Sequence, residues 1–163
     1  MLTCLLTITL SFILAHDILI ATKDQINYEQ LWLTEYANND MVISVKACSD
    51  AHIILSPDVG NTEDVYEIAL GIDDNVHSVI RNTRGGTNHV IAWTEDILSC
   101  DEYRTFWIQW VNGSGIYVGE GPEVGVDEIF RFIDLVGKNI RAAGFSTGNG
   151  ATGSWRIQNV GCK

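Results

Sequence analysis

The amino-acid sequence predicts an all-β protein, an antiparallel β-sandwich of jelly-roll type with about ten short strands. Three observations lead to this fold class. Apolar residues alternate with polar ones in short runs instead of recurring at helical spacing. Turn-forming residues separate the runs at intervals of roughly 8–12 residues, as in sandwiches and barrels. A convincing helix of about ten residues or more is not apparent.

The expected strands follow one another from near residue 28 to residue 160. Each is a short run of apolar or alternating residues, rich in β-branched and aromatic side chains, that ends at Gly, Asn, Asp or Ser. The segment Glu128–Val136 fits either a short helix or another strand. The predicted strands are Tyr28–Leu33, Met41–Ala47, His52–Leu55, Val65–Gly71, His77–Asn82, His89–Trp93, Thr105–Val111, Ile116–Gly119, Ile140–Phe145 and Trp155–Val160.

One hairpin is predicted in detail, around the sequence NGSG at residues 112–115. A four-residue loop with two glycines joins two aromatic-rich runs. Placing Val111 opposite Ile116 sets Trp110 opposite Tyr117, and aromatic packing across the ladder favours this register. The same turn contains an N-glycosylation acceptor pattern, which makes Asn112 a candidate glycan site; the alternative is that the turn needs its glycines and the pattern is chance.

The amino-terminal segment, residues 1–15, has the pattern of a secretory signal peptide. It is apolar and uncharged, it is too short to span a bilayer comfortably, and polar sequence follows it. Cleavage there leaves a mature domain of residues 16–163 that we expect to be secreted and extracellular. No other stretch is long and apolar enough for a membrane span.

The mature chain contains three cysteines, an odd number for an oxidising compartment. Cys48 and Cys100 each follow an apolar strand-like run, whereas Cys162 is the penultimate residue. We therefore expect a disulfide between Cys48 and Cys100. Three fates stay open for Cys162: it joins two chains in a dimer, stays free, or competes for a partner.

The charge balance excludes some partners. Acidic residues outnumber basic ones 21 to 10, which gives a net charge of -11. Such a chain repels a phosphate backbone and an anionic bilayer. Nucleic acid and membrane surfaces are therefore not expected partners.

A glycine pattern near the carboxyl end, GNGATG at residues 148–153, has the spacing G-x-G-x-x-G. A nucleotide site of this type needs a helix after the glycines and an acidic residue about 20 positions further on. Only ten residues follow Gly153, they alternate like a strand, and none is acidic. We therefore expect a loop between two strands and no cofactor.

Metal and catalytic patterns are weak. The four histidines lack paired zinc-site spacing, and the adjacent carboxylates on predicted strands point to opposite faces. Asp73, Asp74 and Asn75 offer oxygen ligands that suit calcium, but a plain turn is the better interpretation. We expect no catalytic residues and no metal site.

Several stretches together resemble one protein family: ISVKACSDAHIILS, YEIALG, HSVIR, ILSCDEYRTFWIQW and GFSTGNGATGSW. In this order they resemble the farnesoic acid O-methyltransferase-like domain of invertebrate proteins, over roughly residues 27–160. The chain departs from the family at Gly71–Asn75, where a turn rich in glycine and tryptophan is usual. The family name implies methyl transfer from S-adenosylmethionine to farnesoic acid, but a methyltransferase sheet needs helical crossovers that this sequence lacks.

The expected function is therefore ligand recognition by a secreted, non-catalytic module, with carbohydrate as the first ligand class and a protein as the other. Trp93, Trp107 and Trp155 are candidates to stack on sugar rings, and the side chains of Asp73, Asp74 and Asn75 to bind hydroxyl groups. The alternative for each tryptophan is a place in the core. The rival function is the methyltransferase that the family name implies.

Overall fold

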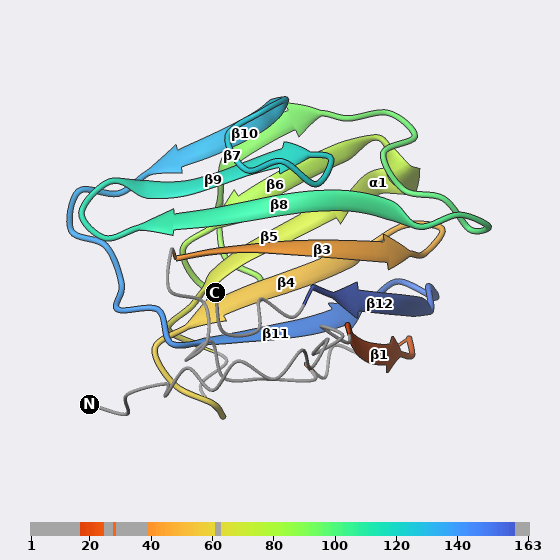
Figure 1. Ribbon diagram of the computed structural model, residues 1–163, viewed down its shortest axis with the longest axis horizontal. Coiled ribbons are helices and arrows are strands. Elements are labelled where there is room, and N and C mark those ends of the chain that lie inside the picture. The colour runs from red at the N-terminus through yellow and green to blue at the C-terminus, as the bar shows by residue number, and fades with distance from the viewer. Residues whose placement is uncertain (1–16, 25–27, 29–38, 61–62, 159–163) are drawn as a thin grey trace, which may run out of the picture.

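The computed structural model describes residues 17–24, 28, 39–60 and 63–158. These residues form two antiparallel β-sheets packed face to face (Figure 1). The six-stranded sheet has the order β1-β12-β3-β8-β9-β10, and the five-stranded sheet has the order β11-β4-β5-β6-β7. The predicted antiparallel β-sandwich is confirmed. The elements are β1 Ile18–Thr22, β3 Asp40–Lys46, β4 Ala51–Ser56, β5 Tyr66–Gly71, α1 Ile72–Asn75, β6 His77–Arg81, β7 Asn88–Trp93, β8 Arg104–Val111, β9 Gly115–Glu120, β10 Glu128–Ile133, β11 Ala142–Thr147 and β12 Gly153–Ile157.

The predicted strands from Met41 onward begin within two residues of the observed ones. The ambiguous segment at Glu128 is a strand, β10, and β1 was not predicted. The predicted strand Tyr28–Leu33 lies outside the described residues except for Tyr28. The proposed signal peptide, residues 1–15, and Cys162 also lie outside them.

Strand alternation builds the core between the sheets. In β3, Met41, Ile43 and Val45 are fully buried, whereas the residues between them are half-buried on the outer face. The two sheets meet through aromatic contacts such as that of Phe145 with Trp155, whose ring centroids are 5.3 Å apart. Each sheet therefore has one face in the core. The opposite face of the five-stranded sheet is buried at Ile54, Ala69 and Val79 and exposed at the β7 edge, at Ile91 and Trp93.

The register of the β8–β9 hairpin differs from the prediction by one residue. Val111 pairs with Gly115, and Trp110 pairs with Ile116 instead of Tyr117. The loop has three residues, and Gly115 belongs to β9. A Cβ atom at Gly115 would lie 2.0 Å from a carbonyl oxygen of β10, so only glycine lets the two strands pair this closely. The rule that aromatic residues pair across the ladder gave the wrong register because it ignored this contact.

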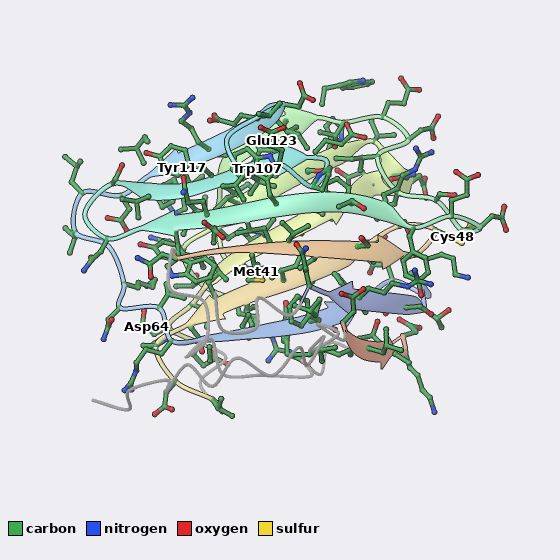
Figure 2. All side chains as sticks on the ribbon, in the orientation of Figure 1. Met41, Cys48, Asp64, Trp107, Tyr117 and Glu123 are labelled. Atoms are coloured by element: carbon green, nitrogen blue, oxygen red, sulfur yellow. A yellow bond between two sulfur atoms is a disulfide. The ribbon has the colours of Figure 1, made fainter. Side chains whose placement is uncertain are left out.

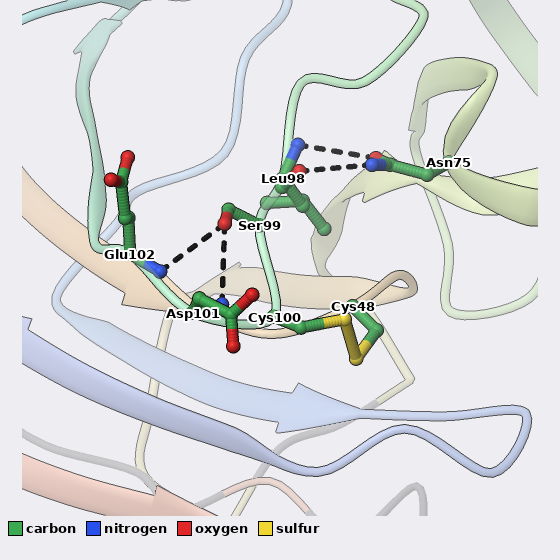
Figure 3. The surroundings of a disulfide bond; sticks show 7 residues. All are labelled: Cys48, Asn75, Leu98, Ser99, Cys100, Asp101 and Glu102. Carbon is green, nitrogen blue, oxygen red and sulfur yellow. Dashed lines mark hydrogen bonds between the residues drawn. A yellow bond between two sulfur atoms is a disulfide. The ribbon is translucent and has the colours of Figure 1, made fainter.

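A disulfide joins Cys48 and Cys100, as predicted (Figure 3). Cys48 follows β3 and Cys100 precedes β8, and these strands are neighbours in the six-stranded sheet. The bond closes a loop with a sequence separation of 52. Loop-closure entropy for this length corresponds to about 4 kcal/mol of stabilisation. The strands inside the loop, β4 to β7, are four of the five strands of the other sheet.

Candidate functional site

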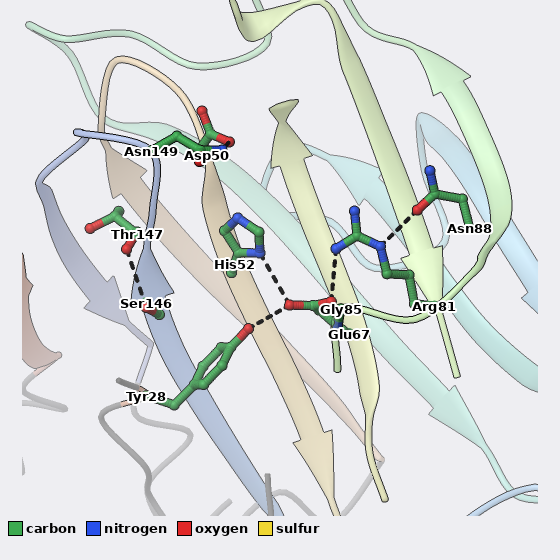
Figure 4. A network of polar contacts seen from close by, with 10 residues as sticks. All are labelled: Tyr28, Asp50, His52, Glu67, Arg81, Gly85, Asn88, Ser146, Thr147 and Asn149. Carbon is green, nitrogen blue, oxygen red and sulfur yellow. Dashed lines mark hydrogen bonds and ion pairs between the residues drawn. The ribbon is translucent and has the colours of Figure 1, made fainter. Parts of the chain in front are cut away.

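A buried carboxylate organises the outer face of the five-stranded sheet (Figure 4). Glu67 is the second residue of β5 and is only 2% exposed. Its carboxylate accepts hydrogen bonds from Tyr28 Oη at 2.7 Å and from Arg81 Nη1 at 2.8 Å. The backbone N–H of Gly85 donates to it at 2.8 Å, and His52 Nδ1 lies 3.2 Å from it. The carboxylate therefore has four partners, which come from different segments of the chain.

These contacts fix the charge state of Glu67. Burial raises the pKa of the Glu67 carboxyl, but the hydrogen bonds of its four partners outweigh burial and hold the pKa well below its ordinary value. The same arrangement raises the pKa of the Tyr28 hydroxyl, through burial first and the charge of Glu67 second. Glu67 is thus an anion at neutral pH whose oxygens are occupied, and it serves as an anchor for its neighbours.

Arg81 extends the anchored network to the edge of the sheet. Its Nη1 group is held by Glu67, and its Nε donates to Asn88 Oδ1 at 2.7 Å. Register explains the arrangement, because Glu67 pairs with Arg81 across β5–β6 and Arg81 pairs with Asn88 across β6–β7. The Asn88 side chain is exposed, so the network ends at solvent with polar groups in fixed positions.

An exposed tryptophan lies further along the same two strands. Trp93 pairs with His77 across β6–β7 and is 70% exposed. The two rings meet edge to face, with centroids 5.0 Å apart and planes at 85°. His77 Nδ1 in turn lies 3.2 Å from Asp73 Oδ2. Ile91, two residues before Trp93 on the same face of β7, is 63% exposed.

We call these residues the β6–β7 face. His77 and Arg81 are four residues apart on one strand, which corresponds to about 13 Å. One end of the face is aromatic and apolar. The other end has the exposed amide of Asn88 and the anchored guanidinium of Arg81, whose side chain is 15% exposed. This combination suits a ligand of comparable length that has both apolar faces and hydroxyl groups. The β6–β7 face consists of Asp73, His77, Arg81, Asn88, Ile91 and Trp93.

The turn at residues 72–75, labelled α1, borders this face. Asp73, Asp74 and Asn75 all have positive φ angles, between 54° and 65°, which Asp and Asn tolerate better than other L-residues. The Asn75 side chain exchanges two hydrogen bonds with the Leu98 backbone, at 3.0 and 3.1 Å (Figure 3). Among the described residues, no three His, Cys, Asp or Glu side chains gather as a metal site.

The predicted site residues separate into two groups. Trp93 and Asp73 come together through His77, with Asp74 exposed beside them. Trp107 and Trp155 are each 1% exposed and present no free ring face. The indole Nε1 of Trp107 donates to the Val126 carbonyl oxygen at 2.6 Å, beside the 121–127 loop (Figure 2).

The burial of Trp155 completes the account of the tryptophans. Its Nε1 donates to Thr22 Oγ1 at 2.9 Å, so the polar atom of the ring is satisfied inside the protein. Sequence reasoning missed His77, Arg81 and Asn88. Two features of the sequence could have indicated them. Polar and apolar residues alternate in HSVIR, and an acidic residue interrupts the apolar run YEIALG.

The glycine pattern at residues 148–153 joins β11 to β12 without a helix. Asp50 holds this loop, because its backbone oxygen accepts from the Gly148 N–H at 3.1 Å and its side chain accepts from Asn149 Nδ2 at 2.6 Å. Within the described residues the only helical segment is the four-residue turn α1. The loop therefore has none of the helix geometry that a dinucleotide fingerprint requires.

Asn112 lies at the exposed tip of the β8–β9 hairpin. Ser114, the third residue of the acceptor pattern, shares a hydrogen bond with Tyr117 Oη at 2.6 Å. The position is accessible to a glycan, and the modification itself stays a prediction.

The fold is a β-sandwich of the architecture seen in a galectin and a β-glucanase of known structure. Over 85% of this chain and 95% of the other, it is similar to the Caenorhabditis elegans galectin LEC-6, at 14% identity and a TM-score of 0.50. It is also similar to a prokaryotic β-1,3-1,4-glucanase (lichenase) derived from a mouse hindgut metagenome, at 12% identity and a TM-score of 0.52, over 88% of this chain and 78% of the other. At these identities the likeness concerns the fold alone.

By sequence, the chain belongs to the farnesoic acid O-methyl transferase family, whose model matches residues 22–160. The resemblance inferred from the motifs is therefore confirmed. The chain matches no curated protein sequence. Among the residues that the structure describes, no helix is long and apolar enough to cross a membrane.

Proposed function

We propose that this protein is a secreted, non-catalytic recognition module that binds carbohydrate on the β6–β7 face. The observation that carries the proposal is the exposed ring of Trp93, held edge to face by His77. Trp93 and Ile91 form two adjacent exposed apolar side chains on one face of β7, and indole rings stack on the apolar faces of sugars.

The polar end of the face supports the same ligand class. Arg81 is held by Glu67 and Asn88, so its guanidinium is positioned before a ligand arrives. Fixed donors and acceptors beside an aromatic ring match the alternation of hydroxyl groups and C–H faces on a sugar. The galectin and glucanase similarities support the proposal at the level of the fold.

An oxidising environment agrees with the disulfide between Cys48 and Cys100. We propose that residues 1–15 direct secretion, that Asn112 carries a glycan, and that Cys162 is available to link two chains. Electrophoresis of the secreted protein with and without reductant tests the last point, since a disulfide-linked dimer band must disappear on reduction.

A glycan array on the purified protein, run with and without calcium, tests the carbohydrate proposal. The Trp93→Ala variant should lose at least about tenfold in apparent affinity for any glycan that the natural protein binds. The reason is that a tryptophan covered by a bound ligand contributes a large share of the binding free energy. The control is Leu135→Ala, which removes an apolar side chain that is 78% exposed on the loop after β10.

Two results would overturn the proposal. The first is that the natural protein binds no glycan under either condition. The second is that Trp93→Ala and Leu135→Ala weaken binding equally. The effect of calcium tests the turn Asp73–Asn75 separately, because that turn places two aspartates beside the face.

The family description favours a second function, methyl transfer from S-adenosylmethionine to a terpenoid carboxylate. Isothermal titration calorimetry with S-adenosylmethionine separates the two functions. Micromolar binding would favour the methyltransferase and require a cofactor site outside the β6–β7 face.

A further inference from the structure

Two cations lie over one aromatic ring on the outer face of the other sheet, close to the disulfide. Tyr103 immediately precedes β8, and two cations lie over its ring. The Arg156 guanidinium carbon is 3.9 Å from the ring centroid, and Lys46 Nζ is 5.6 Å from it. Pairing of β12 with β3 and of β3 with β8 brings these three side chains to one face of the sheet.

These two cations have no carboxylate partner among the described residues, although the chain has 21 acidic residues and 10 basic ones. Arg131 offers a contrast within the same sheet. It lies 5.4 Å over the Tyr117 ring but also forms a bidentate ion pair with Glu128, at 2.5 and 3.0 Å. The ring contact therefore positions Lys46 and Arg156 and leaves their N–H groups able to bind an anion.

Hydroxyl groups and a pocket adjoin the cations. Ser44 Oγ and Thr105 Oγ1 lie 2.8 Å apart on neighbouring strands of the same face. A pocket of about 310 Å³ opens beside the disulfide, within the range of small-ligand sites. Its lining includes the side chains of Lys23, Lys46, Thr152 and Ser154. The surface thus combines positive charge with hydroxyl donors and acceptors.

We propose that this Tyr103 surface, formed by Lys46, Tyr103, Arg156 and the adjoining pocket, binds the oxyanion group of an acidic saccharide. Sulfate esters and uronate carboxylates share the chemistry that Lys and Arg recognise, and the ring hydroxyls of the saccharide suit the serine and threonine side chains. Asp101 and Glu102 are exposed and immediately precede Tyr103, so their negative charge limits the area of this surface that attracts an anion. This site is distinct from the β6–β7 face and does not depend on it.

Isothermal titration with three tetrasaccharides tests the proposal: a sulfated heparin fragment, an unsulfated hyaluronan fragment that carries only carboxylates, and neutral chitotetraose. We expect at least one acidic fragment to bind through the Tyr103 surface in 0.15 M NaCl. Its affinity should fall severalfold in 1 M NaCl, where the Debye length shortens from about 8 Å to about 3 Å. The fragment that binds identifies the anion, and failure of both acidic fragments to bind overturns the proposal.

The double variant Lys46→Gln/Arg156→Gln should lose at least about tenfold in affinity for the acidic fragment, since two charge-assisted contacts are removed. The control is Arg131→Gln, which removes one positive charge, against two in the double variant, from the same sheet at a position that is already paired. Equal losses in the two variants would show a general charge effect and overturn the site. Trp93→Ala should leave this binding unchanged, so failure here and failure of the β6–β7 face are distinguishable.

Discussion

The buried carboxylate of Glu67 gives the sharpest test of how the candidate site is held. The variant Glu67→Gln keeps the shape of the side chain and removes its charge. A glutamine amide can turn its oxygen toward only one pair of donors, so its NH₂ group must face the other pair. Tyr28 and His52 approach one carboxylate oxygen, and Arg81 and Gly85 approach the other (Figure 4).

The expected cost is large because Arg81 keeps its charge while its partner is lost. Removing one member of a buried ion pair costs about 3–5 kcal/mol. For a domain of this size, 1 kcal/mol shifts Tm by about 2–4 °C, so Tm should fall by about 6–20 °C at pH 7. Urea unfolding followed by tryptophan fluorescence measures the change in the free energy of unfolding.

The difference in the free energy of unfolding between the natural protein and Glu67→Gln should depend on pH in a predictable direction. The folded-state pKa of Glu67 is lower than its unfolded value, so its stabilisation is complete above the unfolded pKa, about 4.3, and is lost as the pH falls toward the folded pKa. The gap between natural protein and variant should therefore be constant from about pH 6 to pH 8 and shrink below about pH 4. A loss under 1 kcal/mol at pH 7, or a gap that widens in acid, would refute this account of the network.

Two further variants test the packing and the backbone. Gly119→Ala would place a Cβ atom 2.2 Å from the Trp107 ring, so the indole must move. The free energy of unfolding should fall by about 1–3 kcal/mol. An unchanged near-ultraviolet circular dichroism spectrum together with an unchanged Tm would contradict this. Asp74→Gly should raise the free energy of unfolding by up to about 1 kcal/mol because Asp74 has a φ angle of 59°, a conformation that glycine adopts without strain. Asp101, whose φ angle is not positive, is the control, and its change to glycine should give no gain in the urea midpoint.

The fold was predictable because strand periodicity is a local property. Alternation around Met41–Lys46 or Trp107–Trp110 depends on which side chains enter the core, and that information lies within each run. The hairpin register was not predictable in the same way. It depends on the close approach of β10 to Gly115, which lies on the neighbouring strand and is invisible within the hairpin sequence.

In the candidate site, too, some features could be predicted from local sequence and others depend on contacts between strands. Trp93 was a candidate from its chemistry alone, and it is exposed because it lies on β7 at the edge of the five-stranded sheet. Trp107 and Trp155 have the same chemistry, but they are covered by a loop and by the opposite sheet. The grouping of His77 and Arg81 with Trp93 follows from the pairing of β6 with β7, which composition and spacing do not reveal.

The disulfide between Cys48 and Cys100 encloses four strands, β4 to β7, and the last two of them carry the β6–β7 face. A protease that cuts the backbone anywhere between those cysteines produces two polypeptides that stay covalently attached. The nicked molecule would gain one water in mass, migrate as a single species until it is reduced, and keep the severed strands tethered beside their original partners. Loops such as the one at Thr83–Gly86 can therefore be cut without release of β6 and β7 from the rest of the molecule.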